Sequence, residues 1–364
     1  MIKKSKKTAR IGFLDVLRIF AFISVLLGHK FSTQINQLAL DQSNHIAIRN
    51  IGIGLTAICH GGGTGVIVFF FISGYIITHV LQNESAFDFI IKRLFRIYPV
   101  YFFAVSFEEI LGVLFHNQTL TESTIIIPRL LLIGDFFNTP YGLAGVEWTL
   151  RVEIIFYIFM ATLKAFGVIK KANQLVLIYI ITTLILGVIG PFPSGLFKGY
   201  ASLYGPFLFI GSIIYYLEHR MISKPLSISV VSFIFIMHWT YIAKIQPNWK
   251  EYNFALYGLI LFLSALKYRQ VLENKNTFIR KLSDLTYTVY LFHNWLWIYL
   301  NYVIERIGFT DLPMNLQTMM LLFLFCYITH ITIERYGINT GNRILILYKN
   351  RKINSYHEKT ARNI

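Results

Sequence analysis

Two ionisable side chains in the first apolar segment have the type and spacing that chemistry would need. Arg18 and His29 are 11 residues apart. On a helix this is three turns plus about 20°, so both lie on one face together with Asp15. An imidazole accepts protons or carries an acyl group, and a guanidinium binds phosphate. The alternative is that Arg18 pairs with Asp15 at one membrane surface while His29 simply lies at the other.

A carboxylate further along the chain is a candidate partner for this histidine. Glu153 lies in an apolar segment that we expect to enter from the same side as His29 and to place the two at a similar depth. A carboxylate orients an imidazole and raises its basicity, which suits a general base or an acyl-accepting nucleophile. Glu108 and Glu109 are expected in the same half of the membrane, and they remain open as partners instead. A structural ion pair between Glu147 and Arg151 is a further alternative.

A compact cationic cluster precedes another apolar segment. Lys92, Arg93 and Arg96 lie within five residues of one another. Such a cluster anchors the topology of a membrane helix, because basic residues are retained in the cytoplasm. It also predicts a phosphate site, because guanidinium groups bind phosphate in a bidentate manner.

The composition requires a membrane around these residues. The chain has 364 residues, of which 55% are hydrophobic and 14% charged, and its net charge is +16. A soluble domain has nearly twice that charged fraction. The basic residues lie between apolar segments, so topology explains the charge and we expect no nucleic-acid partner. The two cysteines predict neither a disulfide framework nor a metal site, and the histidines have no metal-ligand spacing.

Apolar segments of bilayer length predict an all-α integral membrane protein with about ten transmembrane helices. We expect a basic cytoplasmic tail at 1–10, a membrane domain at 11–336 and a second basic cytoplasmic tail at 337–364. The apolar segment 124–137 is short and contains Pro128, Arg129 and Asp135, so we expect it to be interfacial or re-entrant. The predicted spans are 11–31, 64–83, 97–116, 145–166, 173–191, 200–218, 226–243, 252–268, 285–304 and 315–336.

The distribution of charge sets the orientation. With both termini cytoplasmic, 24 of the 34 Lys and Arg residues lie on the inner side and 7 on the outer side. This asymmetry obeys the positive-inside rule. An eleventh span at 124–137 would invert every later loop, so ten spans agree better with the charges.

Taken together and in order, these segments resemble the membrane-bound acyltransferase family 3, whose members acylate surface polysaccharides. Coverage extends over nearly the whole chain, so the ordered set is more specific than any single motif. Two features depart from the family pattern. Arg151 stands where a small polar residue is usual, and proline is missing after His293 and after Arg335. The matching segments are 14–21 with His29, 65–75, 92–99, 148–157, 285–293 and 333–335.

The resemblance implies an acyl-CoA co-substrate, usually acetyl-CoA, with no bound cofactor and no metal. It implies a polysaccharide or lipid-linked glycan acceptor, with the enzyme multi-pass in the cytoplasmic membrane among its lipids. Arg18, Lys92, Arg93 and Arg96 would bind the donor, while His29 and Glu153 would be catalytic. Asp15, Ser73, Trp148, Arg151 and His293 would support them.

Other function classes stay open from the sequence. A transporter or flippase of an acyl donor or lipid-linked sugar would also place charges in the membrane. No inverted repeat and no pair of broken helices is visible to favour it. A structural subunit of a polysaccharide export complex is a second alternative. The acceptor hydroxyl, the acyl group and the oligomeric state are not specified by these residues.

Overall fold

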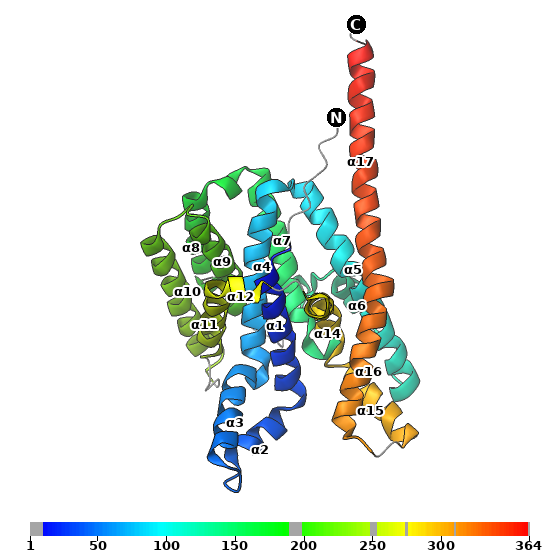
Figure 1. The fold of residues 1–364 in the computed structure, drawn as a ribbon. Coiled ribbons are helices and arrows are strands. Elements are labelled where there is room, and N and C mark those ends of the chain that lie inside the picture. The colour runs from blue at the N-terminus through cyan, green and yellow to red at the C-terminus, as the bar shows by residue number, and fades with distance from the viewer. Residues whose placement is uncertain (1–9, 189–198, 248–252, 274–275, 309–310, 363–364) are drawn as a thin grey trace.

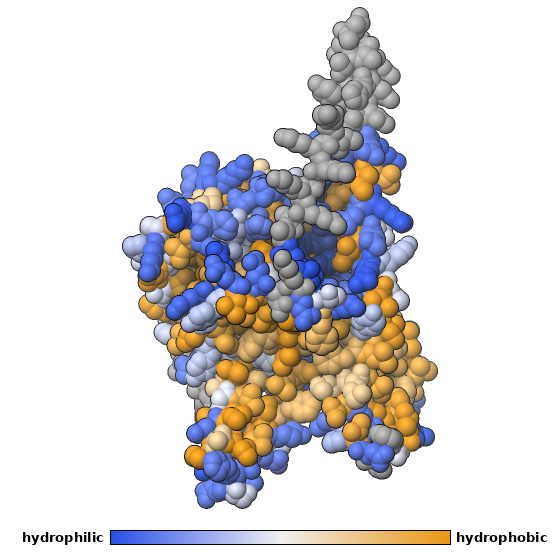
Figure 2. Space-filling model, viewed as in Figure 1, coloured by the Kyte–Doolittle hydropathy of each residue, from blue (hydrophilic) through white to orange (hydrophobic). Residues whose placement is uncertain are grey.

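The chain folds into a bundle of helices with an apolar belt. The computed structural model describes residues 10–188, 199–247, 253–273, 276–308 and 311–362, with side chains described as far as Lys352. Every regular element within these ranges is helical (Figure 1). On the face shown in Figure 2, apolar side chains cover the middle of the bundle, and polar side chains gather at both ends. A bilayer requires this distribution, because its interior cannot solvate polar groups. The predicted all-α membrane fold is confirmed.

The helices have the following bounds. The α-helices are α1 (Gly12–Lys30), α2 (Ser32–Leu40), α3 (Ile46–Cys59), α4 (Gly63–Asn83), α5 (Ala86–His116), α6 (Ser123–Leu130), α7 (Glu147–Ala165), α8 (Ala172–Val188), α9 (Tyr200–Glu218), α10 (Lys224–Ile245), α11 (Phe254–Lys267), α12 (Arg269–Leu272), α13 (Thr277–Asp284), α14 (Thr286–Phe292), α15 (Leu296–Ile307), α16 (Met314–Thr329) and α17 (Arg335–Arg362). The single-turn elements are η1 (His60–Gly62), η2 (Gly134–Phe136), η3 (Leu143–Gly145), η4 (Val168–Lys170) and the π-helical turn η5 (His330–Glu334).

Six helical stretches in the described ranges are long and apolar enough to cross a membrane. They include α1, α4, α5, α9, α10 and the run through α16 into α17, while α8 and α11 are apolar but shorter. These helices overlap predicted spans, whereas the count of ten and the orientation stay predictions. Residues 1–9 of the predicted tail, and residues 189–191 and 252 of two predicted spans, lie outside the described ranges.

Three segments differ in detail from what the sequence predicts or leaves open. The predicted span 285–304 is interrupted at residues 293–295, between α14 and α15. There the carbonyl oxygens of Tyr290 and Leu291 accept hydrogen bonds from the side chains of His293 and Trp295, at 2.7 and 3.0 Å. The apolar segment 124–137 contains the 8-residue α6 and is not a span, as predicted. The predicted C-terminal tail begins within α17, which continues to Arg362.

The centre of the bundle is formed by α4, which packs on α1 and on α9 (Figure 1). Two glycines allow α4 and α9 to approach closely. A Cβ atom on Gly74 would lie 1.9 Å from the carbonyl oxygen of Leu208, and one on Gly211 would lie 2.2 Å from that of Phe71. Small residues of this kind let membrane helices pack backbone to backbone. The result is a rigid scaffold on which the side chains of α1 and α4 keep fixed positions.

Candidate active site

The cationic side chains predicted to bind a donor line one cavity at the end of the bundle where α1 begins. Arg18, Lys92, Arg93 and Arg96 all face this space of about 420 Å³, which we call the arginine cavity. The first helix supplies Arg18, and the first turns of α5 supply the other three. Five basic side chains, including Arg10, outnumber the acidic lining residues Glu84, Asp284 and Glu334. An excess of basic groups in a recess concentrates anions there.

Arg18 is held in place by the carboxylate one turn before it. Its Nη1 atom lies 2.8 Å from Oδ1 of Asp15. Asp15 also accepts hydrogen bonds from Arg10, at 2.6 Å, and from the hydroxyl of Ser283, at 2.8 Å. This carboxylate is 1% exposed. Asp15 therefore fixes Arg18 to the segment that contains α13, and the predicted Asp15–Arg18 contact is present.

Arg93 and Arg96 have charge available for a ligand. Arg93 packs over the rings of Phe89 and Tyr157, with its guanidinium carbon 5.4 and 5.7 Å from their centroids. Within the described residues neither arginine lies in an ion pair with a carboxylate, whereas Lys92 pairs with Glu84. Free guanidinium groups in a recess are suited to bidentate phosphate binding.

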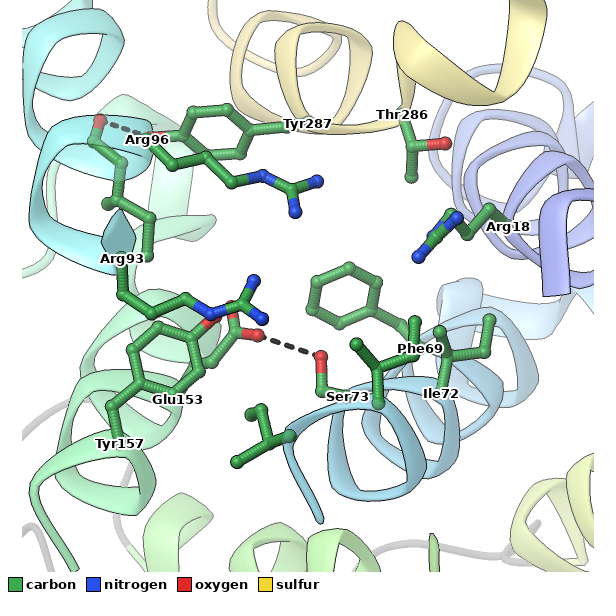
Figure 3. A pocket seen from close by; sticks show the side chains of 13 residues that line it. Arg18, Phe69, Ile72, Ser73, Arg93, Arg96, Glu153, Tyr157, Thr286 and Tyr287 are labelled. Carbon is green, nitrogen blue, oxygen red and sulfur yellow. Dashed lines mark hydrogen bonds between the residues drawn. The ribbon is translucent and has the colours of Figure 1, made fainter. Parts of the chain in front are cut away.

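A smaller space of about 60 Å³ continues inward from the arginine cavity, and we call it the inner chamber. It shares Arg18, Arg93 and Arg96 with the larger cavity, and Ser73 and Glu153 also line it (Figure 3). The hydroxyl of Ser73 donates to Oε1 of Glu153 at 2.7 Å. Glu153 thus faces the guanidinium groups rather than the histidine end of α1.

At the opposite end of α1, two histidines form a pair. Nδ1 of His29 lies 2.8 Å from Nε2 of His293, and the two rings stack with their centroids 5.0 Å apart. His29 is exposed, whereas His293 is 1% exposed. His293 lies at the interruption between α14 and α15.

The tautomers of this pair follow from one carbonyl group. Nδ1 of His293 lies 2.7 Å from the carbonyl oxygen of Tyr290, which can only accept. For a neutral ring, Nδ1 of His293 then carries the proton and its Nε2 accepts. His29 must then donate from Nδ1, and when this ring is neutral its Nε2, beside the η1 backbone at Gly61 and Gly62, carries the lone pair. This is the protonation state that a general base requires.

Neighbouring residues tie both histidines to a loop. Lys30 donates to the backbone carbonyl and the side-chain oxygen of Asn294, at 3.0 and 2.8 Å. The side-chain nitrogen of Asn294 in turn donates to the carbonyl oxygen of Ala144 at 2.8 Å. Leu143 and Ala144 have positive φ angles of 53° and 50°, in the left-handed region that non-glycine residues seldom adopt. The strained loop thus borders the histidine pair.

Aromatic rings separate the inner chamber from the histidines. Phe69 lines the chamber, and its ring stacks on that of Tyr290 with centroids 6.2 Å apart. The ring of Tyr290 lies 5.8 Å from that of His293, and its hydroxyl accepts a hydrogen bond from Thr149 at 2.9 Å. Any group that passes from the guanidinium groups to His29 must move past these rings.

A buried charge network holds the segment around α6. Arg129 donates to Glu147 at 2.6 Å, contacts Glu109 at 3.2 Å and pairs with Glu108. Arg151 contacts Glu147 at 3.4 Å, so the predicted i,i+4 pair exists, and it contacts Asp135 at 3.0 Å. Glu147 and Arg151 are fully buried. Buried charges are tolerated when each has a partner.

Electrostatics within this network follow from burial and charge. Burial on its own lowers the pKa of the Arg129 guanidinium, but the carboxylates of Glu147 and Glu108 outweigh it and raise the pKa. Burial raises the pKa of the Tyr141 phenol, and its hydrogen bond to Asp135 adds to the effect. Both groups therefore keep their protons across the physiological pH range.

The predicted partnership of His29 with Glu153 is wrong. The histidine contacts His293, and Glu153 is bound to Ser73 in the inner chamber. Glu108 and Glu109, the other candidates, are both engaged by Arg129. Matching depths along two helices do not fix which faces meet, and α7 turns Glu153 toward α4. The roles of these residues in catalysis stay predictions.

The remaining predicted residues are divided between regions. Trp148 packs in an aromatic cluster, 4.8 Å from the ring of Tyr200 and 4.7 Å from that of Tyr204. Arg151 belongs to the charge network, and Ser73 belongs to the inner chamber. Sequence reasoning missed the role of Asn294, which follows His293 directly. Its polar side chain within an apolar stretch was a usable signal.

Comparison with known proteins identifies the family. The family described as "Acyltransferase domain" matches residues 11–333. The chain belongs to the membrane-bound acyltransferase family 3. In this acyltransferase-family member, the matched range contains the arginine cavity's basic residues from Arg18 to Arg96 and both histidines.

Two curated proteins are similar to part of the chain. Nodulation protein 10 of Rhizobium leguminosarum bv. viciae is 30% identical over 164 residues, covering 40% of this chain and 41% of that protein. Acyltransferase MdmB of Streptomyces mycarofaciens is 25% identical over 159 residues, covering 42% of this chain and 38% of that protein. The alignments thus span about two fifths of each relative. No solved structure matches the chain.

Proposed function

We propose that this protein is an O-acyltransferase of the cytoplasmic membrane. It moves an acyl group, most simply acetyl, from cytoplasmic acyl-CoA to a hydroxyl of a cell-surface or lipid-linked polysaccharide. The main observation that supports this proposal is that α1 connects two chemically different sites. The arginine cavity lies at its first turns, and the histidine pair lies at its last.

The donor head group belongs in the arginine cavity on this proposal. CoA carries several phosphates on a flexible arm that ends in the thioester. Arg18, Arg93 and Arg96 bind the phosphates, with Lys92 at the rim. The arm extends through the inner chamber and past Phe69 and Tyr290 toward His29. Because the aromatic rings fill this route, they rotate when the arm enters.

Transfer takes place at Nε2 of His29. This nitrogen removes the proton of a glycan hydroxyl while the hydroxyl oxygen attacks the thioester carbonyl carbon. The carbon–sulfur bond breaks, and the CoA thiolate takes the proton from the imidazolium. An acyl-histidine route would use the same nitrogen as the nucleophile. Both routes need the lone pair that the hydrogen bond to His293 leaves on Nε2.

The proposal includes a topology of ten spans with both termini in the cytoplasm. This places the arginine cavity at the inner face, where acyl-CoA is made, and His29 at the outer face, where the acceptor is displayed. The basic residues between the helices support this orientation.

A transfer assay in isolated membranes tests the function. Acetyl-CoA with a labelled acetyl group is added, and ester-bound label on glycan is measured. We expect His29→Ala to abolish the label, while His116→Ala, which changes an exposed histidine at the end of α5, leaves it intact. Normal labelling with His29→Ala contradicts the proposal.

The same assay distinguishes an acyltransferase from the alternative of a transporter. One observation favours that class, since α14 and α15 form a broken helix, a feature that transporters use at their binding sites. Movement of label across the membrane without ester formation on glycan would support transport. Ester formation that depends on His29 supports the acyltransferase.

A further inference from the structure

A third cavity lies at the histidine end of the bundle and has a different chemistry. Its volume is about 440 Å³, within the range of small-ligand pockets. It is formed by α2, α3, η1 and the first turn of α11, and we call it the side cavity. The helical hairpin of α2 and α3 extends beyond the rest of the bundle at this end (Figure 1). The side chains that provide its polar and aromatic surface are Asn36, Thr56, His60, Asn253, Phe254 and Tyr257.

The η1 turn contacts both this cavity and α1. His60 lines the cavity, and Gly62 lies against Val25 of α1. A Cβ atom on Gly62 would be 3.5 Å from Nε2 of His29. Gly61 and Gly62 have φ angles of +55° and +71°, which glycine adopts without strain. Nε2 of His29 therefore lies against the backbone of the η1 turn.

The lining residues select the class of ligand. Among the residues that the structure describes, no Asp, Glu, Lys or Arg lines the side cavity, whereas five basic residues line the arginine cavity. A phosphate or carboxylate would lose its hydration here without gaining a countercharge. Amide groups on Asn36 and Asn253 both donate and accept, which matches a ligand rich in hydroxyl groups. Phe254 and Tyr257 add aromatic surface for the apolar faces of a sugar ring.

Asn36 has one amide group prepared for such a ligand. Its Oδ1 atom accepts a hydrogen bond from the hydroxyl of Thr56 at 3.2 Å. That contact fixes the orientation of the amide, so the amide nitrogen is the atom left to donate. An alkyl chain in the cavity would leave these polar groups without partners.

We propose that the side cavity binds the uncharged sugar unit of the acceptor and presents a hydroxyl to His29 across the η1 turn. The role of this cavity as an acceptor site rests on the proposed acyltransferase function. Carbohydrate binding to the cavity can still be measured without acyl transfer. A neutral carbohydrate is the proposed occupant, because its hydroxyl groups match the amides and its apolar faces match the aromatic rings and the aliphatic residues Ala39, Leu40, Ile53 and Ala57. A phospholipid tail is the competing outcome of the test.

Photo-crosslinking in cells tests the occupant directly. A benzoylphenylalanine is placed at Tyr257, in the His29→Ala background so that transfer plays no part. The matched control places it at Leu263, exposed on the outside of the same helix and absent from the cavity lining. We expect a carbohydrate-positive adduct at 257 and none at 263. Phospholipid alone at 257, or no adduct, overturns the proposal.

A pair of substitutions adds an activity readout. Asn36→Leu is expected to lower transfer to glycan roughly tenfold by removing one hydrogen bond. Binding of labelled acetyl-CoA should not change. Gln37→Leu removes an exposed amide from the same helix outside the cavity and is expected to have no effect. Equal losses in both variants contradict the inference. If neither the parent protein nor any variant transfers acyl groups, but the adduct at residue 257 contains carbohydrate, the proposed function is contradicted and the proposed binding site is supported.

Discussion

Nδ1 of His29 lies 2.8 Å from Nε2 of His293, so one hydrogen bond joins an exposed imidazole to a buried one. The Tyr290 carbonyl fixes a proton on Nδ1 of His293. Nε2 of His293 therefore accepts the hydrogen bond, and Nδ1 of His29 donates it. On our proposal, His293 acts through His29 and is a positioning residue. It has the orienting role that a carboxylate fills in many general-base histidines.

Removing the buried acceptor should cost activity without removing the base. We expect His293→Phe to reduce transfer by about two orders of magnitude, because Nδ1–H of His29 loses its partner and both tautomers become populated. His293→Gln keeps a side-chain oxygen as acceptor and should recover part of the rate. Nitrogen NMR of labelled histidine should report the Nδ1–H tautomer for His29 in the parent protein and a mixture of both tautomers in His293→Phe. An unchanged tautomer in His293→Phe contradicts this role.

Two adjacent glycines offer a comparison at the turn beside His29. Both have positive φ, so alanine is strained at either position. At Gly61 a Cβ atom meets nothing within 4 Å, whereas at Gly62 it lies 3.1 Å from Cα of Val25 and 3.5 Å from Nε2 of His29. We therefore expect Gly62→Ala to reduce transfer much more than Gly61→Ala does. Thermal unfolding of both variants measures the shared strain, and equal transfer rates would refute the close approach.

Donor affinity should depend on Arg93 and Arg96. Each forms charge-assisted hydrogen bonds to phosphate on our proposal, so Arg93→Gln or Arg96→Gln is expected to weaken acyl-CoA binding about tenfold or more. Added salt should weaken acyl-CoA binding to the parent protein more than acyl-CoA binding to the variants, because salt screens the guanidinium–phosphate attraction that the variants lack. Lys349→Gln, on the exposed part of α17 where Lys349 pairs with Asp88, serves as the control. Equilibrium binding of labelled acetyl-CoA gives the measurement.

The buried charge network around Arg129 should stabilise the folded protein against thermal unfolding. Arg129→Met leaves Glu147 buried without one of its partners, which costs about 3–5 kcal/mol in buried ion pairs. We expect a marked fall in the unfolding temperature of the detergent-solubilised protein. Glu122→Gln, at an exposed residue just before α6, is the matched control. A melting temperature equal to that of the control would show that the network contributes nothing.

Local patterns predicted one part of the site and failed at another. The stripe of Arg18 and His29 follows from helix geometry, because both residues belong to one continuous helix. Lys92, Arg93 and Arg96 are neighbours in sequence, so their gathering in one cavity is equally local. Depth in the membrane was the only guide to Glu153, and it says nothing about the rotation of α7 or its neighbours.

The pairing of His29 with His293 needed tertiary information. The two residues are 264 positions apart, and their contact depends on a break in a segment that hydropathy reads as one span. At that break, the side chains of His293 and Trp295 hydrogen-bond the carbonyls of Tyr290 and Leu291. Hydropathy averages over such local hydrogen bonds, so the broken helix was predicted as continuous.

The first helix is fastened at both ends to the same stretch of chain. Near its start Asp15 accepts from Ser283, and at its end His29 and Lys30 contact His293 and Asn294. These anchor points are only about ten residues apart in sequence but are separated by most of the length of α1. On our proposal, a displacement of α1 on donor entry would therefore also shift the histidine pair. The contacts at both ends of α1 would then couple donor binding to the position of His29.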